Sequence, residues 1–320
     1  MLRYIARRVA IAIPMLLVAS FAMFSLIALS GDPLAQIKAT DPPPPPSSIK
    51  SLEHQLGLDK PFLIRYVLWL IGFVHGDFGQ SIQNIDISSQ LASRLGTSMR
   101  LIIGAIVLAA VLAILVGVVS ALRQYGSLDN VLSIIVFVAL AVPVFWLGAL
   151  LKNWAVSLNE SVGATIFYTV GDGAHSGVTG IAILGFMILP VIALTANIFA
   201  SWSRYVRASM IEVLDADYMK LARAKGLRKY QAVWRHGLRN ALVPFVTIVA
   251  LDFSSLVGGA VVTETVFQWR GMGDFLLSAI RNLDVNIIMA WLMIFASATI
   301  LLNLLADIVY GFLDPRISHS

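Results

Sequence analysis

The 320-residue sequence contains no cysteine and few charged side chains. The absence of cysteine excludes disulfide scaffolds, cysteine-ligated zinc and iron–sulfur centres, and catalytic thiols. Charged residues make up 13% of the chain, well below the roughly 25% that is usual in soluble proteins. Hydrophobic residues make up 58%, and the mean hydropathy is +0.83. The composition therefore predicts a membrane protein, and the net charge of +5 is better explained by membrane flanks than by nucleic acid.

Two motifs of catalytic sites are also missing from the sequence. It contains no Gly-x-x-x-x-Gly-Lys-Ser/Thr stretch, the loop that cradles the phosphates of ATP. Its five histidines never take the His-Glu-x-x-His spacing of a helical zinc site. We therefore expect no metal and no cofactor bound by this chain.

Six apolar runs reach the length of about 20 residues that a helix needs to cross a bilayer. They are predicted at Val9–Leu29, Met99–Leu122, Val131–Leu151, Ile181–Trp202, Leu242–Val266 and Ile287–Phe312. The first run follows three arginines, as a signal peptide would, but it is longer than the roughly 7 to 15 apolar residues of a signal core. The sequence thus predicts an all-α polytopic membrane protein that keeps its first helix as an anchor.

Lysine and arginine in the connecting loops predict the orientation of these spans. The stretch between the fourth and fifth spans, 203–240, carries nine basic and three acidic residues. We therefore expect this loop and both termini to face the cytoplasm. The predicted organisation is a first transmembrane helix at 1–30, an external segment at 31–96, a transmembrane domain at 97–312 and a cytoplasmic tail at 313–320.

The external regions give weaker signals. Five consecutive prolines, Pro42–Pro46, predict an extended polyproline spacer. The apolar stretch Pro61–Val74 is too short to span comfortably, which indicates an interfacial helix. The loop Lys152–Gly180 is rich in glycine, serine and threonine and is expected to have little structure of its own.

The loop Ser203–Asn240 predicts a helix, a turn and a second helix. An apolar stripe at helical spacing is formed by Met210, Val213, Leu214, Tyr218, Leu221 and Ala222. Gly226 interrupts the pattern, and a second helical stretch follows from about Lys229 to Arg239. Such a basic, amphipathic segment suits either an anionic lipid surface or a soluble cytoplasmic partner. The small residues around the turn favour a partner, because they allow close approach.

This loop also resembles a known family. The stretches Asp217–Gly226 and Arg235–Pro244 are similar to the coupling loop of binding-protein-dependent ABC permeases, and most similar to the dipeptide/oligopeptide branch. Further stretches resemble that branch at Gly57–Pro61, Gly76–Ser81, Gly258–Phe267 and Asp314–Arg316. Two positions depart from the pattern. Lys220-Leu221-Ala222 stands where the wider superfamily has Glu-Ala-Ala, and Arg270 stands where the branch more often has proline.

The resemblance implies the type I importer permease fold and a set of partners. These are a paralogous second permease subunit, two ATPase subunits or one fused ATPase, an extracytoplasmic substrate-binding protein, and membrane lipid. ATP and magnesium would be bound by the ATPase partners. The resemblance assigns contact with the ATPase to Asp217, Tyr218, Ala222, Ala224, Lys225 and Gly226, with Asp217 capping a short helix and Gly226 allowing a turn.

Carboxylates within predicted spans are candidates for the translocation path. Asp252 and Glu264 lie in the fifth span, and Asp307 lies in the sixth. Each side chain has an alternative role as a contact between helices. This alternative is favoured for Asp307 and Asp252, and the two roles are equally favoured for Glu264.

Two other functions compete with a permease subunit. A secondary transporter or channel would also have several spans and buried carboxylates, but would not need a helical cytoplasmic docking loop. Gly271–Asp274 matches the Gly-x-Gly-Asp motif of intramembrane aspartyl proteases. That motif needs its aspartate inside the membrane, whereas Arg270, Asp274 and Arg281 crowd a loop predicted to lie outside, so the protease interpretation is disfavoured.

Overall fold

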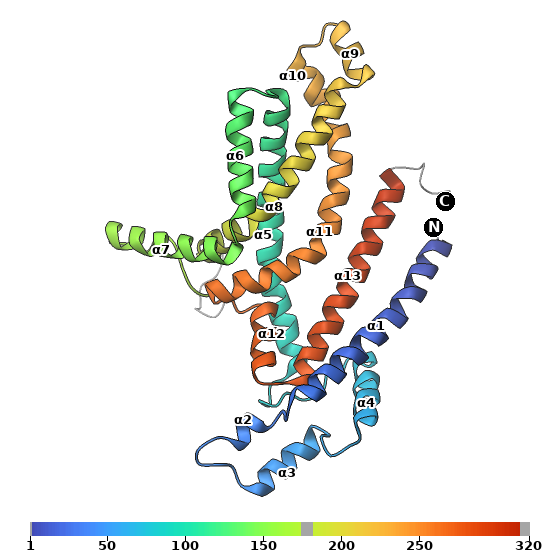
Figure 1. Cartoon of the computed structure of the whole chain (residues 1–320), viewed down its shortest axis with the longest axis vertical. Coiled ribbons are helices and arrows are strands. Elements are labelled where there is room, and N and C mark those ends of the chain that lie inside the picture. The colour runs from blue at the N-terminus through green and yellow to red at the C-terminus, as the bar shows by residue number, and fades with distance from the viewer. Residues whose placement is uncertain (1, 174–181, 314–320) are drawn as a thin grey trace. The chain divides into compact units, whose positions relative to one another are not determined.

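The computed structural model describes the backbone of residues 2–173 and 182–313, with most of their side chains (Figure 1). All regular elements in this described part of the chain are helices, which confirms the all-α prediction. The chain divides into two compact units. The first comprises Met1–Ser98 and Arg270–Leu304, and the second is built on Met99–Trp269.

The first unit contains two long apolar helices and several short ones. Its elements are α1 (Leu2–Ser30), α2 (Ala35–Lys38), α3 (Pro46–Gln55), α4 (Phe62–Val74), the beginning of α5 (Ile87–Leu122), α12 (Met272–Arg281) and α13 (Val285–Leu313). Helix α4 packs on α1 through Tyr66, whose hydroxyl lies 2.9 Å from Ser20 Oγ and donates to the Leu17 carbonyl at 3.2 Å.

A buried carboxylate joins the connection after α4 to the start of α13. Asp284, 2% exposed, accepts hydrogen bonds from Ser81 Oγ at 2.7 Å and from the Ile82 amide at 2.9 Å. Its other oxygen accepts from the Ile287 amide at 3.3 Å. A buried carboxylate with three donors is satisfied rather than costly, so this residue fixes the local backbone of the first unit.

The second unit is a helical bundle. Its elements are the rest of α5, α6 (Ser127–Ala141), α7 (Val144–Val162), α8 (Ala182–Asp215), α9 (Asp217–Ala224), α10 (Lys229–Ala232), a π-helical turn (Val233–Gly237) and α11 (Leu238–Phe267). Trp202 of α8 is fully buried and meets Phe245 of α11 edge to face, with ring centroids 5.5 Å apart. Such aromatic pairs and the surrounding alanines form the core between these helices.

Most of the predicted spans correspond to helices. In the described residues, α1, α5, α8 and α13 are long and apolar enough to cross a bilayer. Helix α11, 30 residues long, covers the predicted fifth span, although several of its side chains lie outside the described residues.

The predicted third span, Val131–Leu151, is not one continuous helix in the structure. The chain instead bends by 102° between α6 and α7, as Figure 1 shows. Val142 and Pro143 are both extended at the break, with ψ of 120° and 137°. Proline has no amide hydrogen to donate and disfavours the helical region for the residue before it, which ends α6 at Ala141.

Three other expectations need correction in their extent. The helix that contains the predicted second span, α5, begins at Ile87, well before Met99. The loop predicted from Lys152 is helical as far as Val162, because α7 meets no helix-breaking residue before Gly163 (φ +70°); residues 174–180 of that loop lie outside the described part. The polyproline run is non-helical only up to Pro45, since Pro46 begins α3, a position that suits proline. The interfacial stretch after Pro61 forms a helix, α4.

Close packing of α5 on α8 depends on Gly117. A Cβ at this position would lie 2.7 Å from Val206 Cβ and 2.9 Å from the Ser203 carbonyl. We predict that Gly117→Val destabilises the protein by roughly 1–3 kcal/mol, as overpacking does. The measurement is the apparent Tm of the purified protein in detergent. The matched control is Gly96→Val on the same helix, where a Cβ would meet nothing within 4 Å; equal losses in both variants would contradict the packing argument.

A helical tip segment on the second unit

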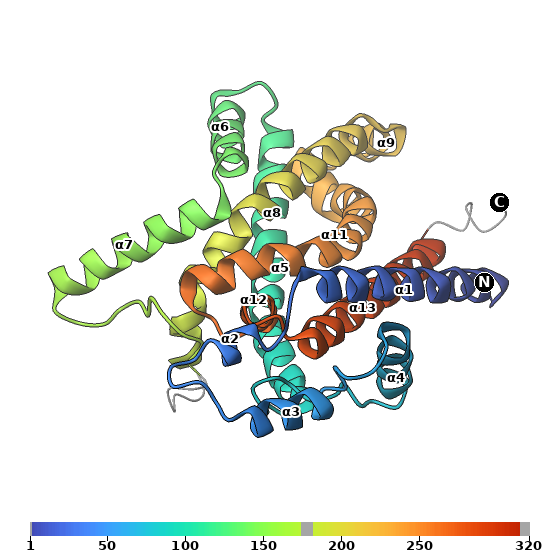
Figure 2. The same cartoon turned by 60° about the horizontal axis from the view of Figure 1, so that its bottom comes forward.

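The tip segment, residues 216–237, connects α8 to α11 and lies beyond their ends in both views (Figures 1 and 2). Ala216 is extended, with φ −66° and ψ 146°, and separates α8 from the eight-residue helix α9. After the turn at 225–228, α10 and the π-helical turn lead directly into α11. The predicted helix, glycine turn and second helix are therefore present, with a π-helical turn inside the second helix.

Met219 anchors the tip segment to the helices behind it. It is 1% exposed and belongs to a cluster with Met210 of α8, Val233 of the π-helical turn and Ala241 of α11. Gly237 makes room for this cluster, because a Cβ there would lie 3.3 Å from the end of the Met219 side chain. The segment is thus packed on its base by buried apolar side chains.

The tip segment also exposes large apolar side chains. Leu221 is 57% exposed and Trp234 71%, and Tyr218 and Tyr230 are exposed as well. Ala224 and Lys225 are also exposed, while Ala222 is half-buried. Several large apolar side chains on one exposed segment indicate an interaction surface.

The predicted apolar stripe does not form one continuous face in the structure. Met210 and Met219 are buried, whereas Tyr218 and Leu221 are exposed. The extended residue Ala216 interrupts the helix, so the 3.6-residue period restarts at α9 and does not continue from α8.

Gly226 is required for backbone conformation. Its φ is +91°, a region that residues with a side chain rarely adopt. The Gly226 amide donates to the Arg223 carbonyl at 3.0 Å, and the Leu227 amide donates to the Ala222 carbonyl at 3.3 Å. This pair of bonds is the Schellman motif that ends helices at glycine, as the predicted turn requires.

Asp217 does not cap α9 as predicted. The N-cap position belongs to Ala216, which makes no side-chain hydrogen bond, and Asp217 is the first helical residue. Its carboxylate lies 3.0 Å from Lys220 Nζ, with both side chains largely exposed. Asp217 still places negative charge in the first turn, where the helix dipole favours it.

A buried ion pair joins three helices near the base of the tip segment. Arg207 of α8 donates from Nε and Nη2 to the two carboxylate oxygens of Asp129, at 3.1 and 2.9 Å. Asp129 lies in the first turn of α6, is 2% exposed, and also accepts from Ser120 Oγ of α5 and from the Tyr125 amide. Sequence reasoning missed this pair; the only signal was a carboxylate two residues after Ser127, at the start of α6.

Lys229 adds a second connection from the tip segment to α5. Its Nζ donates to the Leu122 carbonyl at 3.0 Å, and the Arg228 amide donates to Gln231 Oε1 at 3.1 Å. These bonds satisfy a helix C-terminal carbonyl and a helix N-terminal amide that would otherwise lack partners.

The candidate carboxylates of the spans have different surroundings. Asp252 accepts a hydrogen bond of 2.7 Å from Trp202 Nε1 and so links α11 to α8, which supports its alternative role as a contact between helices. Glu264 is fully buried near the end of α11. The side chain of Asp307 lies outside the described residues. No described group of three or more histidine or acidic side chains is placed to hold a metal ion.

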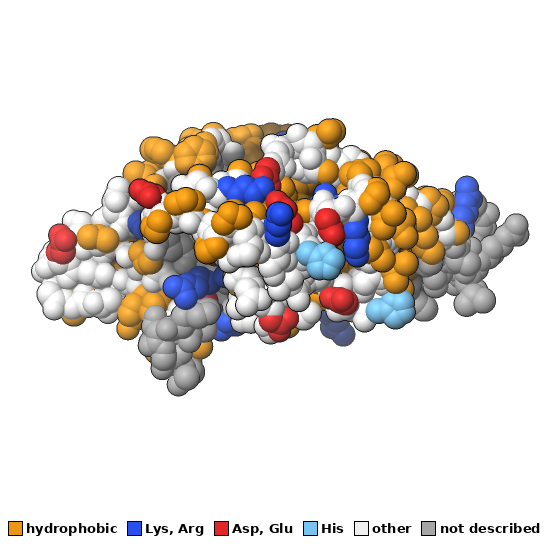
Figure 3. Space-filling model, turned by 90° about the horizontal axis from the view of Figure 1, so that it is seen from below, with side chains coloured by type: hydrophobic (Ala, Val, Ile, Leu, Met, Phe, Trp, Pro, Cys, Tyr) orange, Lys and Arg blue, Asp and Glu red, His pale blue; other side chains and the backbone are white. Residues whose placement is uncertain are grey.

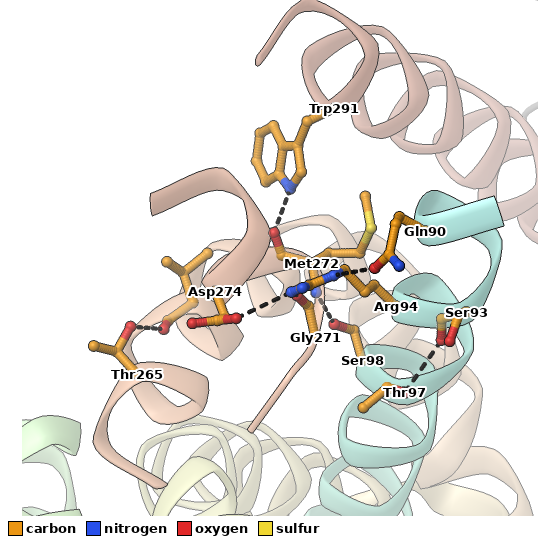
Figure 4. A network of polar contacts seen from close by, with 11 residues as sticks. Gln90, Ser93, Arg94, Thr97, Ser98, Thr265, Gly271, Met272, Asp274 and Trp291 are labelled. Atoms are coloured by element: carbon orange, nitrogen blue, oxygen red, sulfur yellow. Dashed lines mark hydrogen bonds and ion pairs between the residues drawn. The ribbon is translucent and has the colours of Figure 1, made fainter. Parts of the chain in front are cut away.

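Asp274 of the Gly-x-Gly-Asp motif takes part in a structural network in the first unit (Figure 4). Arg94 Nη1 lies 3.0 Å from Asp274 Oδ2, and Arg94 Nε donates to Gln90 at 3.1 Å. Ser98 Oγ accepts from the Met272 amide at 2.8 Å, and Trp291 Nε1 donates to the Met272 carbonyl at 2.9 Å. The aspartate is thus paired with a cation that holds α12 against α5, which is not the two-aspartate arrangement of a protease.

Comparison with known proteins identifies the family. The family described as "Binding-protein-dependent transport system inner membrane component" matches residues 113–319, and its N-terminal companion matches residues 1–100. The "Oligopeptide transport system permease protein OppB" of Mycobacterium tuberculosis is 37% identical over the full length of both chains. The chain belongs to this permease family. Such a protein is a non-catalytic subunit of the inner membrane.

Other permeases are similar to this chain over its whole length. The "Oligopeptide transport system permease protein AppB" of Bacillus subtilis is 34% identical and the "Dipeptide transport system permease protein DppB" of Escherichia coli is 33% identical, each over 100% of both chains. A membrane chain of the MetNI methionine ABC transporter, solved in inward-facing conformations, has a TM-score of 0.56 at 17% identity. It covers 70% of this permease and 96% of that chain, which supports the fold.

We predict that Arg207→Gln destabilises the permease by about 3 kcal/mol, because it leaves the Asp129 carboxylate buried without its cation. The value is at the lower end for a buried pair, since the Arg207 side chain is 30% exposed. The measurement is the apparent Tm in detergent, with Lys220→Gln as the control that breaks an exposed pair and leaves the Tm unchanged. A Tm for Arg207→Gln equal to that of the control would show that the pair contributes little.

Proposed function

We propose that this permease forms one half of the membrane channel of an ATP-driven importer for dipeptides or oligopeptides. The observation that carries the substrate class is the full-length similarity to permeases named for peptide transport, at 32–37% identity. The other half is a paralogous permease subunit, and an extracytoplasmic substrate-binding protein delivers the peptide. Two ATPase subunits, or one fused ATPase, bind ATP and magnesium on the cytoplasmic side.

The tip segment is the part of the permease that contacts the ATPase in this proposal. Its exposed Tyr218, Leu221 and Trp234 supply apolar contact area, and Lys225 supplies charge at the same turn. Ala222, Ala224 and Gly226 keep the turn free of bulk. The orientation that follows from the basic residues at 203–240 places this segment in the cytoplasm.

Motion of the ATPase would reach the spans through the packed base of the tip segment. When ATP binding closes the ATPase subunits, they displace α9, whose Met219 is buried against α8 and α11. The Asp129–Arg207 pair joins α8 to α5 and α6, so these helices would move together. Rigid-body movement of this kind switches other transporters between inward- and outward-open states.

The proposal assigns different roles to the two carboxylates of α11. Asp252, bound to the Trp202 indole, positions α11 against α8. Glu264, near the opposite end of α11 from the tip segment, is the candidate for the peptide path.

Contact with the ATPase can be tested by site-directed crosslinking, because the chain has no cysteine of its own. In the assembled complex, Leu221→Cys is expected to crosslink to a cysteine-reactive probe on the ATPase subunit. Val162→Cys, equally exposed at 55% on α7, is the control and is expected to give no ATPase adduct. The measurement is the mass of the crosslinked product.

The same complex tests the function. ATP-dependent uptake of a radiolabelled tetrapeptide into proteoliposomes is expected with the binding protein present, and Leu221→Asp is expected to reduce it at least tenfold while the two permease subunits stay associated. Uptake that proceeds without any ATPase subunit would instead establish a secondary transporter.

A further inference from the structure

A cavity of about 380 Å³ lies within the first unit, beside α4. Its wall includes Phe24 of α1, Arg65, Leu68 and Trp69 of α4, and Asn286 at the start of α13. The role proposed for the permease does not involve this cavity, since neither the tip segment nor the carboxylates of α11 contribute to it.

Two hydrogen-bond donors in this wall have no acceptor among the described residues. Trp69 is 8% exposed, and its Nε1 is buried without a hydrogen-bond partner. Arg65 is half-buried and its guanidinium lies over the Phe24 ring, 5.7 Å from the centroid, with no carboxylate paired to it in the described part of the chain. A buried donor without an acceptor is unfavourable, which applies to Trp69 Nε1, and the unpaired Arg65 guanidinium lies in the same wall. The two groups together indicate a ligand with acceptor oxygens.

The carboxylates around the cavity are already engaged. Asp284 accepts from Ser81 and Ile82, and Asp77 accepts from the Gly79 amide at 2.9 Å. Asp59, which lies between the cavity residues Leu58 and Lys60 in the sequence, is 2.9 Å from His54 Nδ1, and this hydrogen bond holds the pKa of the Asp59 carboxyl below its usual range. The groups at the cavity that are left without a partner in the described part of the chain therefore include the donors of Arg65 and Trp69. A ligand that matches them offers acceptor oxygens to the Arg65 cation, as an anion does.

The position of α4 on α1 indicates the depth of the side of the cavity that α4 and Phe24 form. Phe24 precedes Leu29, the predicted end of the apolar run of α1, by about 8 Å along the helix, and Leu17 precedes it by about 18 Å. Tyr66 bonds to Leu17 and Ser20, and the Phe62 ring lies 5.4 Å from that of Phe24. The first turns of α4 thus lie at the depth of the lipid chains in the leaflet at the Ser30 end of α1.

The free face of α4 is apolar throughout. It consists of Leu63, Ile64, Val67, Leu68, Ile71 and Val74, which are between 47% and 75% exposed. Leu68 belongs both to this face and to the cavity wall, so the apolar surface continues from the cavity that contains Arg65. On the face of the molecule shown in Figure 3, basic, acidic and histidine side chains likewise lie next to a gathering of hydrophobic ones.

We propose that the cavity and the free face of α4 together bind an anionic phospholipid. Arg65 and Trp69 Nε1 donate to the phosphate oxygens, and the acyl chains lie along Leu63, Val67, Leu68 and Ile71. Guanidinium is well suited to phosphate because it offers donors in a planar fork. A free phosphate ion satisfies the two donors equally well but leaves the apolar face without an occupant.

The proposal is tested by native mass spectrometry of the purified complex titrated with phosphatidylglycerol, with phosphatidylcholine, and with inorganic phosphate. We expect one tightly bound phosphatidylglycerol that phosphatidylcholine does not displace, and no competition from millimolar phosphate. Arg65→Gln is expected to weaken this binding about tenfold, and Trp69→Phe, which keeps the ring and removes only the donor, several-fold. The matched control is Lys50→Gln, an exposed cation on α3 of the same unit.

Three results would overturn the proposal. One is unchanged phosphatidylglycerol binding in both Arg65→Gln and Trp69→Phe. Another is an equal loss in Lys50→Gln, which would show that net charge alone attracts the lipid. The third is saturation by inorganic phosphate without any lipid preference, which would indicate a site for a soluble anion. Because Trp69→Phe conserves the packed ring, it keeps the test informative if Arg65→Gln does not fold.

Discussion

The burial of Met219 is the interaction on which the functional part of this permease depends. The side chain fills a space formed by α8, the π-helical turn and α11, and removing a buried methionine typically costs about 2–5 kcal/mol. Without this contact, an eight-residue helix would not be stable by itself, since isolated helices of this length are marginal in water. With it, Leu221 and Trp234 are held in fixed positions on the exposed side. An apolar surface on an anchored base can transmit force, whereas the same residues on a flexible loop could not.

Polar contacts fix the arrangement of helices whose surfaces are otherwise uniformly apolar. Packing of such surfaces by dispersion and shape alone allows several helix arrangements, and a buried hydrogen bond favours one of them. Asp129 with Arg207, Asp252 with Trp202, and Asp284 with Ser81 each join elements far apart in the sequence. The small residue Gly117 acts in the same way by allowing α5 to approach α8. The tip segment and the cavity beside α4 share one property: each has side chains without a partner among the described residues of the chain itself. These are the exposed Leu221 and Trp234 in the tip segment, and Arg65 and Trp69 Nε1 in the cavity.

The sequence predicted the elements of this permease much better than their contacts. Hydropathy located the long helices because a membrane span must be continuously apolar, and Gly226 predicted its turn because of its backbone freedom. The break at Pro143 was missed because the apolar run continues through it, although a proline in the middle of a span was visible. The burial of Met219 instead of Leu221 depends on one extended residue, Ala216, which nothing in the sequence marks. The Asp129–Arg207 pair joins residues 78 positions apart, and a single sequence carries no signal for such pairings.

The central claim, that the tip segment is rigidly held on its base, is tested most directly by distance measurements between two spin labels. One label is placed at Lys220→Cys on α9 and the other at Leu128→Cys on α6, both exposed positions of the second unit. A single narrow distance distribution in the assembled complex, unchanged in width between the ATP-bound and ATP-free states, is the result expected for an anchored lever. A broad distribution that narrows only when ATP is bound would show that the segment is ordered by its partner, and would contradict this account.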